Sequence, residues 1–447
     1  MSSILHAGVQ SCFWLNSVWN TVLQWNKIMK DFPLLDRREV LKAGLRFSTA
    51  TLGMGAAGAF GQSVPFAPPD STKVLGPPPS ALGQRSPFET PQKFLRPGTA
   101  TAGASFTPLE ILHGIITPAD LHFERHHAGI PVIDPGSFEL MIHGLVDRPM
   151  KFTLNDLKRF PATSKICFIE CSGNGRQAAS LPDGLPEDIT PGQLDGLFSV
   201  SEWTGVKLST LLDEVGASRR ATWMLAEGQD AAVMGRSIPM RKALDDAMVV
   251  YAQNGEAIRP EQGYPLRLLL PGWEGNANVK WLRRLEISDA PFMMRDETSK
   301  YTDAMADGRM RMFTFEMAPK SLITNLSYPH VMQRKGFHEI RGIAWSGGGK
   351  ISRVDISLDG GRNWARAALQ EPVLDKCATC FRYGFDWQGE ERIIMSRATD
   401  EQGNTQLGYV DNEANRGPGT SYHNSAIRPW KIHADGHITF AMKEVAA

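Results

Sequence analysis

The run from Lys165 to Arg176, KICFIECSGNGR, places a thiol at the end of an apolar stretch, with a polar, glycine-containing loop directly after it. The apolar run predicts a buried β-strand that ends at Cys171. An accessible thiol with nearby donors and the positive charge of Arg176 has what a metal-bound or reactive cysteine needs, because such surroundings favour the thiolate. A half-buried structural cysteine is the simpler alternative, since unpaired cysteines are commonly buried.

Two adjacent histidines, His126 and His127, form a second group that could bind a metal ion. Neighbouring residues of a strand point to opposite faces, so these two side chains would not share one ion easily. No third ligand stands at helical spacing from them, which disfavours a zinc hydrolase built on this pair.

The cysteines are too few for a disulfide scaffold and lack the paired spacing of a zinc ribbon; they are Cys12, Cys167, Cys171, Cys377 and Cys380. Cys377-Ala-Thr-Cys380 is followed by Phe381 and not by histidine, so it is no c-type haem attachment site, and no haem is expected in this chain. Two alternatives are left for Cys377 and Cys380: a disulfide in an exported protein, or two unlinked thiols.

The loop from Cys171 to Arg176 resembles the Cys-Ala-Gly-Asn-x-Arg loop of the sulfite oxidase family. In that family the cysteine thiolate is the one protein ligand of a molybdenum ion held by a molybdopterin dithiolene, and a soft sulfur ligand suits such a metal. The resemblance implies a molybdenum-molybdopterin cofactor, with Cys171 as metal ligand and catalytic residue and Arg176 as a cofactor-binding residue.

The segment from Phe123 to Pro131 resembles the family's Phe-x-x-Arg-Asn-His-x-x-x-Pro stretch. The match implies that Arg125 binds the substrate and that His127 contacts the pterin. His126 stands where the family has asparagine.

Four more residues match the family's site. Asp230 matches a pterin contact, although a solvated turn aspartate is the simpler alternative. Arg267 and Lys280 match basic residues at the pterin phosphate and ring, and Gln262 replaces a histidine that often stands just before this stretch. Tyr301 follows Lys280 by 21 residues, the family's spacing to its active-site tyrosine.

The elements around these residues must position them. Alternating residues predict a strand at 138–146, and the apolar run at 263–272 predicts a buried strand framed by turn residues. The segment 152–157 is expected to cap a short helix. We expect Trp203–Val206 to form a loop that opens another helix at Leu208–Leu212.

From about Met312 the sequence changes to short alternating strands with glycine turns, at the spacing of a sandwich. Ala344–Gly349 and Asp359–Trp364 resemble the immunoglobulin-like dimerisation domain of the same family. The expected fold is α+β, with a sulfite-oxidase-type mixed α/β molybdopterin domain followed by an immunoglobulin-like β-sandwich. Relatives lend a second arginine to the anion site from this domain, and either His423 or Arg428 could take that place.

The chain has 447 residues, enough for two domains with tails, and its 48 basic residues balance 48 acidic ones. This balance disfavours binding to nucleic acid or to an anionic lipid surface. The expected organisation is a leader with an export signal at 1–61, an extended Pro/Gly-rich arm at 62–108, the molybdopterin domain at 109–311 and the dimerisation domain at 312–447.

The leader carries Arg37-Arg38 ahead of a mild apolar segment, followed by Ala57-Gly58-Ala59, a cleavage pattern. This resembles a twin-arginine export signal and implies a periplasmic protein; an ordinary basic helix end is the alternative. Polar residues break the first 30 positions, so a membrane-spanning helix is not expected there, and Met29 is an alternative start.

Within the family, Glu297–Asp303 and Tyr422–Asn424 resemble the molybdenum subunits of periplasmic sulfane dehydrogenases. The resemblance implies oxidation of a sulfur compound by oxo transfer in thiosulfate oxidation, on a substrate that could be carried on a protein. Electrons would pass to a c-type cytochrome subunit, and two copies would join as a homodimer. A sulfite dehydrogenase acting on free sulfite is the near alternative. A cofactor-free exported binding protein with an immunoglobulin-like module is the alternative of another class.

Overall fold

The computed structural model describes residues 74–99, 102–180, 185–305, 307–416 and 422–442. Contacts divide the chain into two units, Met1–Gly83 and Gln84–Ala447, and the fold below is that of the second. The expected twin-arginine signal, its cleavage pattern, Met29 and Cys12 lie outside the described residues. Among the described residues, no helix is long and apolar enough to cross a membrane.

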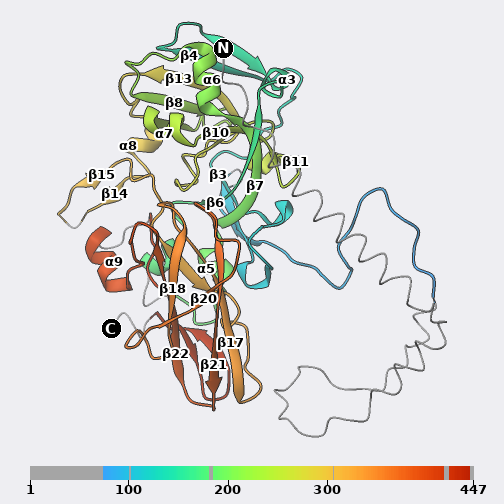
Figure 1. Ribbon diagram of the computed structural model, residues 1–447, viewed down its shortest axis with the longest axis vertical. Coiled ribbons are helices and arrows are strands. Elements are labelled where there is room, and N and C mark those ends of the chain that lie inside the picture. Colours follow the sequence, from blue (N-terminus) through green and yellow to red (C-terminus); the bar gives the residue numbers. More distant parts are fainter. Residues whose placement is uncertain (1–73, 100–101, 181–184, 306, 417–421, 443–447) are drawn as a thin grey trace, which may run out of the picture. The chain divides into compact units, whose positions relative to one another are not determined.

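The first half of the second unit holds three main sheets, which carry the candidate site (Figure 1). An antiparallel sheet contains β1 (Phe94–Pro97), β2 (Gly103–Phe106) and β3 (Glu124–His126). A second sheet runs in the order β11 (Glu256–Ala257), β10 (Met248–Gln253), β7 (Phe198–Lys207) and β6 (Ala162–Glu170), with β12 (Arg267–Leu269) also paired to β10. A third sheet runs in the order β5 (Met150–Thr153), β4 (Glu139–Gly144), β13 (Leu282–Ser288), β8 (Trp223–Gly228) and β9 (Gly235–Pro239), with β4 and β13 parallel.

Short helices connect these strands. They are α3 (Leu154–Leu157), α4 (Arg176–Ser180), α5 (Pro191–Asp195), α6 (Leu208–Val215), α7 (Met240–Asp245) and α8 (Arg295–Thr298), with 3-10 turns at Leu109–Ile111, Ala119–Leu121 and Pro260–Gln262. A two-stranded ribbon, β14 (Asp303–Ala304) and β15 (Met310–Arg311), follows α8.

Helix α6 forms where it was expected, because its apolar residues recur at helical spacing. Leu208, Leu211, Leu212 and Val215 are all buried and join the core between the second and third sheets. Gly216 ends the helix with φ of 67°, a left-handed conformation that glycine adopts without steric cost. The expected cap of α3 is also present, since the Thr153 hydroxyl accepts from the backbone N–H of Asp156.

The prediction of a loop at Trp203–Val206 is wrong, because these residues form the end of strand β7. They pair with β6 on one side and with β10 on the other, and Trp203 is fully buried. Gly205 allows this close pairing, since a Cβ there would collide with the carbonyl oxygen of Val249. Gly205 is therefore required for close strand pairing and not for a turn.

Part of the extended arm predicted at 62–108 forms β-strands. Its last residues form β1 and β2, which pair with each other and, through β2, with β3. The pairing satisfies the backbone hydrogen bonds of a segment that has few apolar residues of its own. The arm therefore supplies part of the sheet that carries Arg125.

The C-terminal part is a sandwich of two antiparallel sheets, whose long strands β17, β18, β21 and β22 are visible in Figure 1. One sheet has the order β16 (Lys320–Ile323), β17 (Gly336–Trp345), β21 (Thr379–Trp387) and β20 (Ala368–Leu369). The other has the order β19 (Ala365–Arg366), β18 (Ile351–Ser357), β22 (Arg392–Asp400), β23 (Trp430–Ile432) and β24 (Ile438–Phe440), and α9 (Tyr409–Arg416) lies between β22 and β23 in sequence. Side chains of both sheets form one core that includes Ile340, Phe381, Val354, Ile394 and Trp430.

Candidate active site

Cys171 stands directly after β6, at the start of a tight polar loop. Its backbone N–H donates to the Leu197 carbonyl at 2.9 Å, and its own carbonyl accepts from Asn174 at 2.9 Å. The Asn174 side chain closes the loop by donating to Glu170 Oε1 at 2.9 Å and accepting from Leu197 N–H at 3.0 Å. The strand and loop around the thiol are therefore as the sequence predicted, and the thiol is held in one place.

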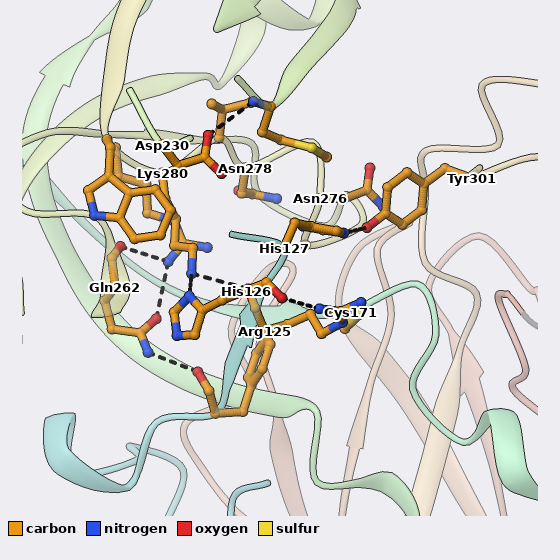
Figure 2. A pocket seen from close by; sticks show the side chains of 16 residues that line it. Arg125, His126, His127, Cys171, Asp230, Gln262, Asn276, Asn278, Lys280 and Tyr301 are labelled. Carbon is orange, nitrogen blue, oxygen red and sulfur yellow. Dashed lines mark hydrogen bonds between the residues drawn. The ribbon is translucent and has the colours of Figure 1, made fainter. Parts of the chain in front are cut away.

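Two adjoining cavities meet at this thiol. The first is called here the Arg267 cavity (Figure 2). The second, of about 380 Å³, is called the Arg176 cavity. Both are lined by Cys171, Arg125, His127 and Tyr301.

The structure brings all of the predicted site residues to these two cavities. Besides the four shared residues, Asp230, Arg267 and Lys280 line the first cavity, and Arg176 lines the second. They come from strands, loops and a helix that are far apart in sequence. Their individual roles stay predictions, but their common location is what a cofactor and substrate site requires.

The Arg267 cavity contains buried positive charge with little compensation from the protein. The Arg267 guanidinium is 3% exposed, donates only to the backbone and side-chain oxygens of Gln262, and leaves its Nε without a hydrogen bond among the described residues. Burial lowers its pKa to about 9. Burial and the nearby Arg267 charge lower the pKa of Lys280 to about 7. Among the described residues, Asp230 is the one carboxylate that lines the cavity.

This electrostatic pattern fits an anionic cofactor. A buried guanidinium with an unpaired N–H is costly until an anion accepts from it, and a phosphate group would do so. The residues present therefore fit molybdopterin, whose phosphate Arg267 and Lys280 would hold, with Cys171 as the thiolate ligand of its metal.

Asp230 lies in the turn between β8 and β9, and its carboxylate accepts from the backbone N–H of Met234 at 3.0 Å. It is buried at 6% exposure, so the simpler alternative of a solvated turn aspartate does not apply. Its carboxylate holds the turn that forms one wall of the Arg267 cavity.

The adjacent histidines turn to opposite sides, as Figure 2 shows. His126 lies 2.9 Å from Lys280 Nζ through Nδ1 and 2.9 Å from Glu124 through Nε2, whereas His127 Nε2 lies 2.8 Å from the Tyr301 hydroxyl. The pair therefore offers no joint ion site, and among the described residues no group of three or more His, Cys, Asp or Glu could hold a metal ion.

The two residues that depart from the family pattern, His126 and Gln262, both form hydrogen bonds with neighbouring side chains or backbone. His126, in place of asparagine, joins Lys280 to Glu124. Gln262, in place of histidine, is buried, donates to the Phe123 carbonyl at 2.8 Å and accepts from Arg267 at 3.3 Å. Both line the Arg267 cavity, so the cavity wall is complete at each position.

Tyr301 is held between aromatic and cationic neighbours. Its ring lies 5.3 Å from that of Tyr422, and the Arg236 guanidinium carbon lies 5.4 Å from its centroid. Burial raises the pKa of the Tyr301 hydroxyl well above its usual value, so it carries its proton. Burial and the Arg125 charge lower the pKa of His127 to about 4, so the imidazole is neutral, and its Nε2 shares a hydrogen bond with the Tyr301 hydroxyl.

The expectation that nearby positive charge favours the Cys171 thiolate is not met by the protein alone. Burial raises the pKa of the Cys171 thiol, and it outweighs the opposing influence of the Gly173 backbone N–H and of Arg125. Arg176 is exposed and does not reverse this effect. A bound metal cation would, because coordination deprotonates a thiol outright.

Neither candidate for a second C-terminal anion-site residue lines the cavities. Arg428 is 1% exposed and pairs with Asp195, with Nε 2.8 Å from Oδ2. His423 is buried, with Nε2 3.3 Å from Glu274 Oε2. Each is paired with a buried carboxylate.

Residues that sequence reasoning did not assign to the site line the Arg176 cavity instead, namely Arg96, Lys300 and Tyr422. Lys300 and Tyr422 stood within motifs that matched the family, which was an available signal. Arg96 lay in the presumed arm, where no pattern pointed to a site. The other pair left open, Cys377 and Cys380, is present as free thiols.

A buried polar cluster ties the loop of Cys171 to the C-terminal sandwich. Glu170, the residue before Cys171, accepts from Trp345 Nε1 at 2.7 Å and lies 3.3 Å from Lys320 Nζ. Lys320 Nζ also lies 2.6 Å from Asp195 Oδ1, and Asp195 pairs with Arg428. We call these five residues the Glu170 cluster.

Comparison with known proteins identifies the family. Residues 127–295 match the oxidoreductase molybdopterin binding domain, and residues 311–423 match the Mo-co oxidoreductase dimerisation domain. The chain is 31% identical over 284 residues to a nitrate reductase [NADH] of Ulva prolifera, covering 57% of this chain but 32% of that protein. It thus spans about a third of the length of the nitrate reductases that it matches.

Two other relatives are matched over most of their own length. Sulfite oxidase of Gallus gallus is 31% identical over 330 residues, which cover 67% of this chain and 70% of that protein. The crystal structure of the sulfane dehydrogenase SoxCD from Paracoccus pantotrophus is 40% identical with a TM-score of 0.76, and the match covers 84% of this chain and 99% of that chain. This chain therefore belongs to the sulfite oxidase family of molybdopterin oxidoreductases and is similar to SoxC, as the motifs around Cys171 predicted.

Proposed function

We propose that this protein is the catalytic subunit of a sulfane dehydrogenase, which oxidises a sulfur compound by oxo transfer at molybdenum during thiosulfate oxidation. One observation carries the proposal. Two cavities meet at Cys171, one with buried cations suited to a cofactor phosphate and the other with exposed cations suited to an anionic substrate. The similarity to sulfane dehydrogenase SoxCD favours sulfur as the atom that is oxidised.

The residues of the chain have distinct tasks in this reaction. Molybdopterin, when bound, would supply a metal centre able to accept two electrons and to provide the sulfur with an oxygen derived from water. Arg125 offers planar paired donors to an anionic substrate, and Arg176 adds positive charge from the loop of Cys171. The Tyr301 hydroxyl, oriented by neutral His127, stands at the junction of the cavities, where it can donate to the reacting group.

We also propose the partners and the location that follow from this reaction. Two electrons must leave one at a time, and the sequence contains no Cys-x-x-Cys-His haem site, so a separate c-type cytochrome is the acceptor. The twin-arginine motif at Arg37-Arg38 favours export of the folded, cofactor-loaded protein to the periplasm.

The match to a dimerisation domain favours a homodimer joined through the C-terminal sandwich. We assign this sandwich to the immunoglobulin-like class. Its sheet orders, β16-β17-β21-β20 and β19-β18-β22-β23, correspond to strands A-B-E-D and C′-C-F-G of that fold when the strands are lettered in chain order.

The test is to produce the full chain in a host that makes molybdopterin, and to measure molybdenum content and turnover with a c-type cytochrome. Free sulfite and a carrier protein bearing a cysteine persulfide are compared as substrates. The proposal expects one molybdenum per chain and faster turnover of the persulfide. A Cys171→Ser variant made in parallel gives the background rate.

Three outcomes would change the assignment. Turnover of sulfite alone would make the protein a sulfite dehydrogenase, the second candidate, which the match to sulfite oxidase favours. A chain that takes up no molybdenum would support a cofactor-free binding protein. Nitrate with a reduced dye is included because nitrate reductases are also relatives, and turnover of nitrate alone would refute sulfur oxidation.

A further inference from the structure

Arg96 lies outside both segments that match the family, yet it lines the Arg176 cavity. Strand β1 carries Arg96, and β1 pairs through β2 with β3, which carries Arg125. The register sets Arg96 opposite Ala104, and Ala104 opposite Arg125. Residues directly opposite one another in neighbouring strands point to the same face of a sheet. The two arginines therefore face one cavity with a single small side chain between them.

We propose that Arg96 is an anion-binding residue of the substrate site, which acts together with Arg125 on an anionic sulfur group. This inference deepens the proposed function and rests on it for the identity of the substrate. It makes the hairpin of β1 and β2, which the sequence predicted as part of a connecting arm, one wall of the site.

The charges around Arg96 favour an anion over a protein partner. Arg125, Arg176 and Lys300 line the same cavity, and among the residues that the structure describes none of those lining it is a carboxylate. Partial burial and the charge of Arg176 lower the pKa of Arg96, so these two guanidinium groups lie near enough to repel each other. An anion between them would relieve this repulsion.

The nearest acidic residue on the same sheet does not neutralise Arg96. Glu124 precedes Arg125 on β3, so its side chain points to the opposite face. Its carboxylate is already bound by Lys93 and His126. Arg96 instead packs on an aromatic ring, with its guanidinium carbon 5.2 Å from the centroid of Phe106. Stacking leaves the planar N–H donors of an arginine available to a ligand.

The size of the cavity agrees with this role. At about 380 Å³ the cavity is larger than a sulfite ion requires, and its volume falls within the range of sites that hold larger ligands. A cationic group at the hairpin can therefore contact an anion that is attached to a longer molecule, while Arg125 contacts the end next to Cys171.

The test measures sulfate binding by calorimetry on the full, molybdopterin-loaded chain and on Arg96→Gln. The expected result is an approximately tenfold higher dissociation constant in the variant, because one charge-assisted hydrogen bond is lost. Leu95→Gln, on the same strand but the opposite face, controls for disturbance of the hairpin. Arg159→Gln, whose side chain is 83% exposed, controls for the loss of one positive charge. Both controls should bind sulfate within about twofold of the parent.

Kinetics on sulfite provide a second readout. The variant should show a higher KM with unchanged kcat and unchanged molybdenum content, and Arg96→Lys should recover part of the affinity by restoring the charge. A difference that vanishes at high salt would mean that Arg96 only attracts anions from a distance, which overturns the contact.

The outcomes separate this inference from the proposed function. If the parent oxidises sulfur and Arg96→Gln binds sulfate as the parent does, the inference alone is overturned. If sulfate binding depends on Arg96 but the parent oxidises no sulfur compound, the anion site stands and the proposed function is refuted. Circular dichroism of Arg96→Gln verifies its fold, and an unfolded variant would show that the hairpin is structural, against the role proposed.

Discussion

Replacing Lys320 by methionine should destabilise the protein strongly and loosen the loop that holds Cys171. Lys320 is 1% exposed, and its ammonium group lies 2.6 Å from Asp195 Oδ1 and 3.3 Å from Glu170 Oε1. It also donates to the carbonyl of Asn424 at 3.1 Å. Methionine has a similar length and keeps the packing, so the change removes mainly the charge and its hydrogen bonds.

The expected cost is about 3–5 kcal/mol, the range for removing one partner of a buried ion pair. Asp195 keeps Arg428, with Nε 2.8 Å from Oδ2, so part of the charge in the Glu170 cluster stays compensated. We therefore expect the lower end, about 3 kcal/mol, which changes the ratio of folded to unfolded protein by about two orders of magnitude.

The pH dependence of this cost has a defined sign. Burial acts to raise the pKa of Asp195, but Arg428 and Lys320 outweigh it, and the pKa is lowered overall. A carboxylate with a lowered folded-state pKa contributes stability above its unfolded pKa of about 4, and loses it as the pH falls through the folded value. The difference in stability between parent and Lys320→Met should thus be full at pH 7 and shrink below about pH 4.

Urea unfolding followed by tryptophan fluorescence measures this difference, with the exposed Lys350→Met as the matched control. Molybdenum content reports the state of the loop, because Glu170 directly precedes Cys171; we expect the content to fall in Lys320→Met only. Parent and variant with equal urea midpoints would refute the idea that the Glu170 cluster joins the sandwich to the Cys171 loop.

Three further changes test the site itself. Cys171→Ser should abolish turnover with the fold retained, because a hydroxyl is too basic and too hard to replace a thiolate. Cys167→Ala, in the buried part of the preceding strand β6, should keep activity and lose about 1 kcal/mol of stability; molybdenum analysis and urea unfolding compare the two variants. Arg125→Gln should raise the KM for an anionic substrate at unchanged molybdenum content, since an amide cannot match paired guanidinium donors, and equal kinetics would make Arg125 structural. Tyr301→Phe should lower kcat by removing the hydroxyl held by His127, and an unchanged pre-steady-state rate of molybdenum reduction would exclude that role.

Local patterns in the sequence were sufficient for the strand and loop of Cys171 and for α6. In the first case an apolar run meets a glycine-containing loop, and in the second the apolar residues recur every three or four positions. Local patterns also located the residues around the cavities, because motifs such as the one at Arg125 keep their order and spacing along the chain. The helical cap at Thr153 is equally local, since its hydrogen bond spans three residues.

The pairing partners of a segment are not a local property. Trp203–Val206 contains a glycine and resembles a loop, but neighbours on both sides make it a strand. Arg96 belongs to the site because β1 pairs through β2 with β3, a contact between distant segments that composition does not reveal. Register across a sheet decides which face a side chain occupies, and register is set by the whole sheet.

The charge state and the burial of the candidate site residues also depend on the tertiary structure. From sequence, Arg428 and His423 were equal candidates for the anion site, but Asp195 and Glu274 hold them within the buried interior. The acidity of Cys171 likewise depends on the solvent excluded around it, which no spacing along the chain records. The sequence by itself determined which residues could perform the chemistry. Only the tertiary structure decided which of them share a cavity and in what state of charge, because burial and electrostatic interactions depend on distances between segments far apart in the chain.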